Sequence, residues 1–470
     1  MKNSRSSRFV FLFLVCGMLF LLAACGSAQT GQDNPSPAPR NGSAQAAQSN
    51  PSPVPGSGNG SAQAGKGNPS PAPAHGNGSA TSGGTTPAGG SSIPTHQVTT
   101  APYPPTQTSC PSTGTARPAV MLPFTLGSDP NLVYIYNDGT QGLLKRYDLT
   151  NGQKQVIVTG PYIDNAQVSA DGQWVLFTSA IQPHAGITAL QLVRMDGQGL
   201  QTLYCTTGPL NSVQWSPNQQ FVAFSFLADR STTVILLNIN TGMLQTELSV
   251  ASPLALGKWL DNTHLYLTSL LPEAPNTLYL LDTANGANQT SGLLTTILQA
   301  QSPFAFDSSF DANQLYIAGC RGPEQGSSIG PCSIAVQDPT HGPEYPVYIS
   351  SSYAITEVQV VTPTTLLFLI NNVSLPGQPA DTSHNGLWKI NTDGSGLTAL
   401  APSTTGQSFQ LNSYTQYPWS NLSRDGNWYS FQNVTSSGVS LMFASISGGA
   451  PTVFASTASD NVAIAGWTTM

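Results

Sequence analysis

The chain has 470 residues, of which 8% are charged, and a formal net charge of −7. A soluble domain is typically about a quarter charged, so most of the polarity here comes from uncharged side chains, which suits a secreted protein. The sequence has no basic patch, and this excludes nucleic acid as an expected partner. The length alone allows about two to four domains.

The first 25 residues have the pattern of an export signal. Lys2, Arg5 and Arg8 precede the apolar run Phe9–Leu22, whose about 14 residues are too few for an ordinary membrane-spanning helix. The run ends in Leu22-Ala23-Ala24-Cys25, which resembles the lipobox of bacterial lipoproteins. The resemblance implies cleavage before Cys25 and attachment of a diacylglycerol to its sulfur. The diacylglycerol brings two acyl chains, whereas one chain alone gives only marginal, reversible membrane binding, and the new amino group is a further site for acylation. An ordinary secretory signal with a chance cysteine is the alternative.

A tether is expected after the signal. From Gly26 to about Ser109 the chain has no Leu, Phe, Trp or Met, and it repeats a Pro-rich unit at Asn34–Pro39, Asn50–Pro55 and Asn68–Pro73. Such a composition buries too little apolar surface to offset the entropy of ordering, so we predict disorder. We assign residues 1–24 to the signal peptide, 25–115 to the lipidated cysteine and a disordered linker, and 116–470 to a folded domain.

The folded domain repeats one β-rich unit. A turn opens each unit, at Asp129, Asp171, Pro217, Asp261, Asp311, Pro363 and Asp425. An apolar strand follows each turn, at Leu132–Tyr136, Trp174–Thr178, Phe221–Phe226, Leu265–Leu270, Leu315–Ala318, Leu366–Ile370 and Trp428–Phe431. A second strand comes next, at Leu144–Leu149, Leu190–Met195, Val234–Ile239, Leu278–Asp282, Ser333–Gln337, Leu387–Asn391 and Leu441–Ile446. A Gly-bearing turn and a weaker strand complete several of the units.

The repeat length indicates a β-propeller. With one more strand before each opening turn, the unit has four antiparallel strands, and propeller blades of four strands take about 45 residues. The piece Val462–Trp467 has no unit after it. We therefore predict an all-β, seven-bladed β-propeller whose C-terminal strand completes the first blade, since closure removes an unpaired edge. Counts of six or eight stay open if Ala119–Phe124 adds a strand.

Three turns carry a family resemblance. Ser169-Ala170-Asp171-Gly172, Trp215-Ser216-Pro217-Asn218 and Ser423-Arg424-Asp425-Gly426 resemble the W-S-P-D-G units of TolB-like propellers, which belong to the WD40-like PD40 repeats. The resemblance covers most of residues 126–467 and implies the propeller fold. Proteins of the TolB type carry a separate N-terminal domain, whose place the linker takes here. Their envelope partners are therefore not carried over.

Four cysteines lie outside the signal and the lipobox. An even number in an oxidising compartment indicates disulfides, and four cysteines allow three connectivities. We favour Cys110–Cys205, which would attach the start of the domain to its second repeat, and Cys320–Cys332, which would close a Gly- and Pro-rich loop. Free buried thiols are the alternative. The spacing matches no zinc motif, so no metal site is expected.

No catalytic residue or cofactor is expected either. Gly326-Ser327-Ser328-Ile329-Gly330 fits G-x-S-x-G, but that motif requires a strand before the serine and a helix after it, and no helical pattern follows. We therefore expect that the chain is not an enzyme. Loops on a rigid scaffold often carry recognition, and the longest insertions are Cys320–Cys332 and Leu375–Asn385. Trp388, Trp419 and His384 are the candidate ligand-contact residues, with core packing as the alternative for each tryptophan.

These observations together predict a binding or scaffold module of the cell envelope. The expected protein is an extracytoplasmic, monomeric propeller, anchored by lipid to the cell membrane, with the outer membrane or the cell surface as alternatives. Its expected partner is an envelope protein or a glycan. A glycan hydrolase or lyase that uses the central channel is the competing class, and a purely structural envelope protein is a third.

Overall fold

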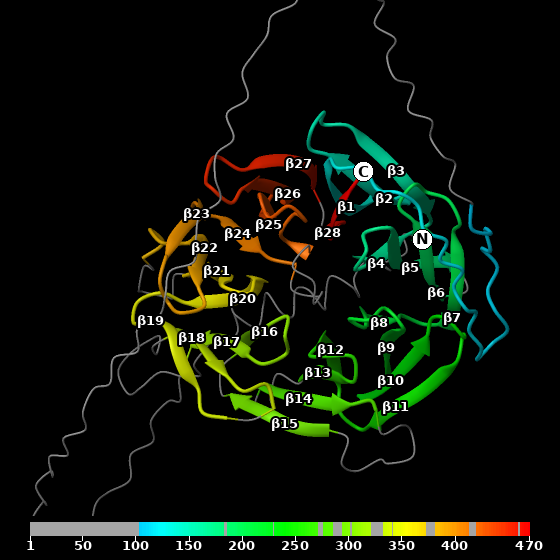
Figure 1. The fold of residues 1–470 in the computed structure, drawn as a ribbon, viewed down its shortest axis with the longest axis horizontal. Helices are drawn as coiled ribbons and strands as arrows, with labels where there is room; N and C mark the ends of the chain where they lie inside the picture. Colours follow the sequence, from blue (N-terminus) through cyan, green and yellow to red (C-terminus); the bar gives the residue numbers. More distant parts are fainter. Residues whose placement is uncertain are drawn as a thin grey trace, which may run out of the picture. The chain divides into compact units, whose positions relative to one another are not determined.

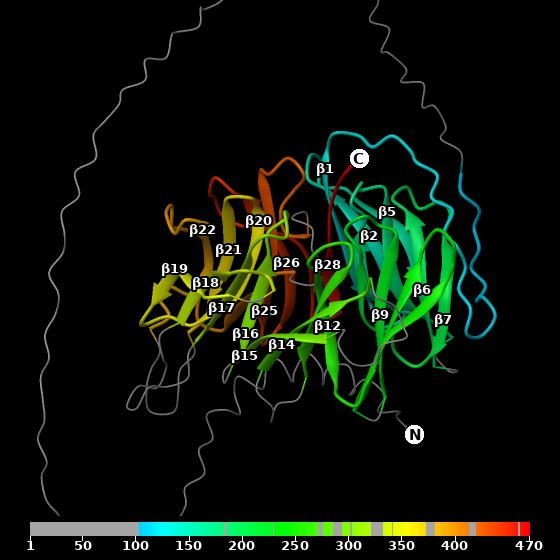
Figure 2. The ribbon, with the colours of Figure 1, turned by 60° about the horizontal axis from the view of Figure 1, so that its bottom comes forward.

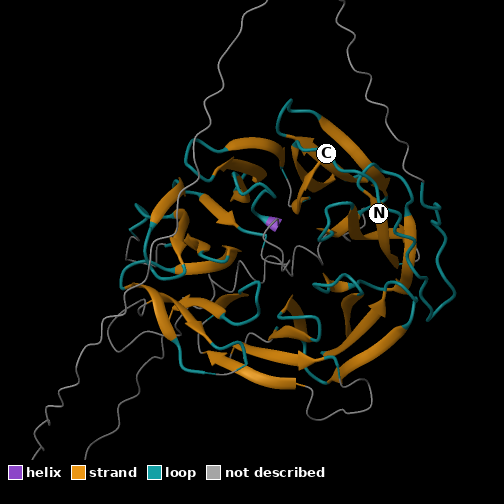
Figure 3. Ribbon diagram, in the orientation of Figure 1, coloured by secondary structure: helices purple, strands orange, loops and turns teal. Residues whose placement is uncertain are grey.

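In the computed structural model the body of the chain is a ring of small sheets around a central axis (Figures 1 and 2). The structure describes residues 103–182, 186–228, 230–270, 276–284, 294–300, 303–320, 332–340, 342–372, 381–412, 420–458 and 461–470. These residues form seven four-stranded antiparallel sheets, as the repeat predicted. They contain no α-helix, and the small helical element near the axis is a 3₁₀ turn at Ser420 (Figure 3). Within the described ranges, no helix has the length and apolar character needed to cross a membrane.

The first four blades, each given from its innermost to its outermost strand, are as follows. Blade 1 contains β28 (Val462–Thr469), β1 (Pro130–Asn137), β2 (Gly142–Asp148) and β3 (Lys154–Gly160). Blade 2 contains β4 (Ile163–Val168), β5 (Trp174–Gln182), β6 (Ile187–Arg194) and β7 (Gln201–Thr207). Blade 3 contains β8 (Asn211–Trp215), β9 (Phe221–Ala228), β10 (Ser231–Asn238) and β11 (Leu244–Val250). Blade 4 contains β12 (Leu254–Trp259), β13 (His264–Ser269), β14 (Asn276–Asp282) and β15 (Leu294–Ala300).

The remaining three blades follow the same order. Blade 5 contains β16 (Phe304–Ser308), β17 (Leu315–Cys320), β18 (Cys332–Gln337) and β19 (Tyr345–Ser350). Blade 6 contains β20 (Ile355–Thr362), β21 (Thr365–Ile370), β22 (Gly386–Asn391) and β23 (Thr398–Pro402). Blade 7 contains β24 (Gln407–Gln410), β25 (Trp428–Thr435), β26 (Gly438–Ser445) and β27 (Thr452–Thr457).

The C-terminal strand closes the ring, which confirms the predicted closure. β28 pairs antiparallel with β1, with Trp467 opposite Leu132, and Trp467 is completely buried. Arg424 in blade 7 crosses the junction, because its guanidinium donates to the carbonyls of Ser169 and Ala170 in blade 2, both at 2.9 Å. Blades 7, 1 and 2 are thereby joined where the two ends of the propeller meet.

The serine and aspartate of the repeat organise the opening turns. In blade 2 the Ser169 hydroxyl donates to Asp171, and the backbone N–H groups of Gln173 and Trp174 donate back to these two side chains. Gly172 has a φ of +78°, and an added Cβ would lie 3.0 Å from Arg424. Glycine adopts a positive φ without strain, so the turn favours the Asp-Gly signature. Gln219 and Ala312 take the same position in the turns of blades 3 and 5, both with a φ of +59°, so glycine is favoured there but not required.

The blades are joined near the axis by a belt of buried polar side chains. This polar belt consists of Gln167, Gln214, Lys258, Asp307, Gln359 and Asn421, all at most 6% exposed. Its members bond across blade boundaries: the Gln167 amide donates to the carbonyl of Val213, and Asn421 donates to Gln359. Because buried polar groups must be paired, the belt favours one fixed arrangement of neighbouring blades.

Every outermost strand contains a β-bulge. The register shifts by one residue in each, and the extra residues are Ile157, Leu203, Glu247, Ile297, Val347, Leu400 and Phe454. Six of these seven are apolar, and Glu247 is the exception. Its carboxylate is 3% exposed and has no hydrogen-bond partner among the described residues. Burial, with a smaller contribution from Asp282, raises the pKa of Glu247 to about 7.

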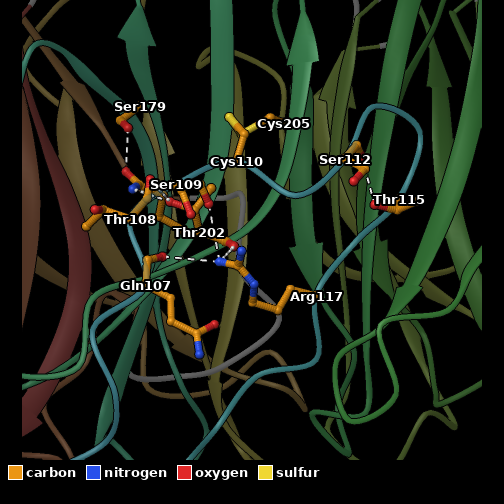
Figure 4. The surroundings of a disulfide bond; sticks show 11 residues. Gln107, Thr108, Ser109, Cys110, Ser112, Thr115, Arg117, Ser179, Thr202 and Cys205 are labelled. Atoms are coloured by element: carbon orange, nitrogen blue, oxygen red, sulfur yellow. Dashed lines mark hydrogen bonds between the residues drawn. A yellow bond between two sulfur atoms is a disulfide. The ribbon is translucent and has the colours of Figure 1, made fainter.

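Residues 103–124, here called the N-terminal segment, pack on the outside of blades 2 and 3 (Figure 4). Gln107 pairs in parallel with Gln201 of β7, and Cys110 is bonded to Cys205. Farther along, the Arg117 N–H donates to the carbonyl of Leu203 at 2.8 Å. Residues 103–115, which composition assigned to the linker, are therefore part of the packed body. Ala119–Phe124 adds no strand to any blade, so the alternative count of eight that it suggested is not found.

Candidate functional site

Three aromatic rings form a stack beside blade 6. Tyr353 lies in the connection between β19 and β20, His384 precedes β22, and Trp388 lies within β22. The ring centroids of Tyr353 and His384 are 4.3 Å apart, and those of His384 and Trp388 are 6.0 Å apart with planes within 11°. All three side chains are half-buried. We call these residues the aromatic stack.

Polar groups surround the stack. The Asp381 carboxylate accepts hydrogen bonds from the Ser383 hydroxyl at 2.6 Å and from the Tyr353 hydroxyl at 3.4 Å. The bond from Ser383 is the main cause that lowers the pKa of Asp381. The Ser383 hydroxyl also lies 2.8 Å from Nδ1 of His384, and the Trp388 indole donates to the His384 carbonyl. Asp381 and Ser383 are exposed, so an apolar ring surface lies beside exposed acceptors.

Serine, histidine and aspartate occur together here, but not in the order of a catalytic triad. In a triad the histidine lies between the nucleophilic serine and the acid, so that it can take the serine proton. Here Ser383 lies between Asp381 and His384, and its proton is directed to the carboxylate. The arrangement therefore differs from a triad, because the carboxylate and not the histidine accepts the serine proton.

Two buried asparagines hold the connections that carry the stack. Asn372 accepts from the Ala354 N–H and donates to the carbonyls of Ser352 and Asp381. Asn385 accepts from the Asn372 N–H and donates to the Asn372 carbonyl. The residues on both sides of Tyr353 and His384 are thus bonded to each other. The rings are therefore presented by a preorganised framework.

The strand ends that flank the two long insertions lie on the same face of the propeller. The insertion after Cys320 joins β17 to β18, and the one after Asn372 joins β21 to β22, so both connect the second and third strands of neighbouring blades. Cys320 and Cys332, which lie opposite each other at the ends of these strands, form a disulfide. Both disulfides favoured by the sequence are thus present.

The structure brings together two of the three predicted contact residues, Trp388 and His384. Trp419 and the lipobox residue Cys25 lie outside the described residues, as does the serine-containing motif of residues 326–330. Tyr353 was missed by sequence reasoning, because nothing in its local sequence distinguishes it from an ordinary loop tyrosine.

Besides Asp307 of β16, two carboxyl groups on innermost strands have raised pKa values. Burial raises the pKa of Glu357 in β20 to about 8, although its carboxylate accepts a hydrogen bond from the Leu411 N–H at 2.7 Å. Burial also raises the pKa of Asp164 in β4 to about 6. The two strands belong to blades 6 and 2, which are not neighbours. No group of three or more metal-ligating side chains occurs in the part of the chain that the structure describes.

The comparisons with known proteins concern the fold. No protein-family model and no curated protein matches the sequence. The solved structures that resemble it include prolyl endopeptidases (TM-score 0.50, 12% identity, 72% of this chain and 50% of theirs) and TolB from Acinetobacter baumannii (TM-score 0.38, 12% identity, 57% and 62%). The propeller domain of the Trilobed protease from Pyrococcus furiosus has a TM-score of 0.45 at 10% identity, over 71% of this chain and 98% of that one. These comparisons show a shared β-propeller fold.

The expectation that the chain is not an enzyme is contradicted by these comparisons. Besides the prolyl endopeptidases, similar structures include an acylaminoacyl peptidase, a puromycin-hydrolyzing peptidase of Mycobacterium tuberculosis and prolyl oligopeptidase B of Galerina marginata. The chain spans about half the length of each of these peptidases and about three-fifths of the TolB chain. The propeller is therefore an architecture that enzymes share, and the absence of a recognised motif does not exclude catalysis.

Proposed function

We propose that this protein is an extracytoplasmic binding module that recognises a glycan at the aromatic stack. The supporting observation is the combination of half-buried, stacked rings with the exposed oxygens of Asp381 and Ser383. Binding sites commonly join aromatic surface to a few polar groups that fix orientation. A sugar has an apolar C–H face that suits a ring, and hydroxyl groups that donate to a carboxylate.

The proposal includes a location outside the cytoplasm, which two further observations support. Two disulfides are typical of an oxidising compartment, and the segment before Cys25 has the pattern of a lipoprotein signal. A lipid at Cys25 would hold the propeller at a membrane surface. Restriction to a surface raises the effective concentration of the module toward ligands of the same envelope.

The test is glycan binding by the full mature chain on an array of cell-envelope polysaccharides, followed by titration of each hit. Tyr353→Ala and Trp388→Ala should each weaken binding by about tenfold or more, which corresponds to about 1.4 kcal/mol. Tyr345→Ala is the matched control, because Tyr345 is an exposed tyrosine at the opposite end of β19. Tyr353 and Trp388 both pack partly against the core of blades 5 and 6, so melting curves of the two variants separate a loss of binding from a loss of folding.

Two outcomes would overturn the proposal. One is the absence of any glycan bound by the wild-type chain. The other is binding that Tyr353→Ala and Trp388→Ala leave unchanged. Capture of an envelope protein that the same two variants abolish would reassign the aromatic stack to a protein ligand.

One observation favours a second function, acid catalysis near the axis. A general acid must hold its proton at neutral pH, and the raised pKa of Glu357 meets that requirement. Hydrolysis assays on peptide and glycan substrates, with Glu357→Gln as the comparison, test this function. Activity that survives the substitution would exclude Glu357 as the acid.

A further inference from the structure

A groove runs between the last blade and the first. It has a volume of about 440 Å³ and is lined by Tyr134, Tyr136, Lys145, Lys154, Val453, Phe454, Ala455 and Ser456. An adjoining hollow of about 530 Å³ shares Tyr136 and Ser456 with it. The walls are β27 of blade 7 on one side and β1, β2 and β3 of blade 1 on the other. We call this the blade 7–1 groove.

The same position between blades 2 and 3 can be identified from the strand register. Tyr134 lies opposite Lys145 in blade 1, as Phe224 lies opposite Ile235 in blade 3. Counting from the bulges also matches Tyr136 with Phe226, Lys154 with Leu244, and Phe454 with Leu203. The blade 7–1 groove therefore has a direct counterpart, the blade 2–3 groove.

The counterpart is filled by the protein's own chain. Ala116, Ala119 and Met121 of the N-terminal segment pack against the core cluster of blades 2 and 3, against which Phe226, Ile235 and Leu244 also pack. The backbone is bonded as well, since the Arg117 N–H donates to the bulge carbonyl of Leu203 and the Ala119 N–H donates to Ile239. This contact shows that a groove of this geometry accepts an extended segment beside the outermost strand.

Backbone pairing is equally available at the blade 7–1 groove. β27 is the outermost strand of its sheet, and no described segment forms a strand ladder with the outer edge of residues 452–456. An exposed strand edge is a ready template for an added strand. Val453 of β27 is 52% exposed, which leaves an apolar side chain for an added segment to cover.

The side chains that line the blade 7–1 groove differ in charge from those of the blade 2–3 groove. This difference in charge indicates which kind of segment the blade 7–1 groove would bind. Ile235 and Leu244 of the blade 2–3 groove are replaced by Lys145 and Lys154, and the lining contains no carboxylate. Lys145 lies over the ring of Tyr136 at 5.4 Å, which places its ammonium group beside the groove. We propose that the blade 7–1 groove binds an extended, acidic segment of another protein, which pairs with β27. The occupant is not the linker of this chain, because residues 26–102 contain one acidic residue, Asp33, against Arg40 and Lys66.

The proposal depends on the groove alone and is independent of the aromatic stack. The probe is a ten-residue peptide with the sequence of residues 113–122 carrying Ala116→Glu, Ala119→Glu and Met121→Glu. Its affinity for the full mature chain is measured by titration at low salt and at high salt. The unsubstituted peptide serves as the control ligand. We expect the acidic peptide to bind at least about tenfold more tightly than the control, with an advantage that salt reduces.

Variants of the chain locate the binding. Lys145→Glu combined with Lys154→Glu should abolish the preference for the acidic peptide, whereas Lys145→Arg combined with Lys154→Arg should retain it. Lys154 is exposed and Lys145 is half-buried, so melting curves of the two double variants verify folding. Hydrogen exchange should show added protection in β27 when the acidic peptide is bound.

Three results would overturn the proposal. The first is no binding of the acidic peptide by the wild-type chain. The second is equal binding by the charge-reversed and charge-retaining variants. The third is protection of another outermost strand in place of β27. Because no readout involves glycans, failure here is distinguishable from failure of the proposed function.

Discussion

Lys258 of blade 4 and Asp307 of blade 5 form an ion pair across the blade boundary, with Nζ and Oδ1 2.8 Å apart and both side chains at most 5% exposed. The other carboxylate oxygen of Asp307 accepts from the Val360 N–H of blade 6 at 2.8 Å. Three blades therefore meet at one carboxylate. Burial raises the pKa of Asp307, and Lys258 with the backbone N–H groups opposes part of that rise.

This pair leads to the first prediction. Lys258→Met leaves the Asp307 charge buried without its cation, so the free energy of unfolding at pH 7 should fall by about 3–5 kcal/mol. Adding Asp307→Asn to this variant removes the unpaired charge while keeping an acceptor for Val360, and should restore much of the loss. Denaturant titrations of the three proteins measure both effects. Equal destabilisation of the single and double variants would show that the loss comes from the packing of the Lys258 side chain and not from an unpaired charge on Asp307.

Glu247 carries the second prediction, which concerns pH. Its pKa is raised from 4.5 to about 7 in the folded chain, so between these values the folded state binds more protons than the unfolded state. Stability should therefore decrease as the pH rises from about 4.5 to about 7 and then level off. Glu247→Leu, which restores the apolar residue found at the other bulges, should remove about 2 kcal/mol of this dependence and raise stability above pH 7.

Denaturant titrations at pH 5 and pH 8 measure the slope for the wild type and for Glu247→Leu. Glu247→Gln is the matched control, since it removes the charge but keeps a buried polar group. A wild-type slope that Glu247→Leu leaves unchanged would assign the pH dependence to other groups.

The third prediction separates the two disulfides. Cys110–Cys205 closes a sequence separation of 95 residues and ties the N-terminal segment to β7, so Cys110→Ser with Cys205→Ser should cost about 2–4 kcal/mol. Cys320 and Cys332 lie opposite each other in paired strands only 12 residues apart, so Cys320→Ser with Cys332→Ser should cost less. Limited proteolysis should cut near residues 103–115 in the first double variant only. Cleavage there in both double variants would argue against the assignment.

The fourth prediction concerns ring closure. A chain that lacks residues 462–470 loses β28 and Trp467, exposing the inner edge of β1 and the core around Leu132 and Tyr134. We expect aggregation or a large loss in the midpoint of thermal unfolding. Trp467→Phe, which keeps the strand but loses the indole bond to Ser430 at 2.9 Å, should have a much smaller effect. An unchanged melting curve for the truncated chain would be incompatible with the closure described here.

The fifth prediction tests the lipid anchor. Cys25→Ser should release the protein from membranes into the soluble extracytoplasmic fraction, because the acylated sulfur would be lost. Fractionation followed by immunoblotting measures the distribution, and Cys16→Ser, within the signal itself, is the matched control that should remain attached. Membrane attachment that persists in Cys25→Ser would point to another means of retention.

The sequence sufficed for the blades because each repeat carries its own local signal. The Ser-x-Asp turn at Ser169 and the apolar strand at Trp174 can each be recognised from a few consecutive residues. The strand Val462–Trp467 belongs to no repeat of its own, so ring closure was the simplest explanation for it. The two disulfides could be predicted because the number of remaining cysteines is even, because Cys320 and Cys332 flank one short loop, and because Cys110 and Cys205 were then the remaining pair.

Contacts between blades could not be read in the same way. Glu247 lies in the weak strand Leu244–Val250, where alternation would place it outward. The bulge resets that alternation, so that Glu247 and Leu248 are both buried. Tyr353 contacts His384 only because the connection between blades 5 and 6 and the connection between β21 and β22 of blade 6 lie on the same face. The packing of residues 103–124 depends on grooves that neighbouring blades create together.

The pairing of Leu132 with Trp467 has a consequence for how the protein forms. A chain that emerges amino-terminus first exposes β1 long before β28 exists, so the first blade is the last to be completed. Contacts so distant along the chain form slowly. The inner edge of β1 therefore stays unpaired for longer than any other inner edge of the propeller, even though that part of the chain emerges earliest.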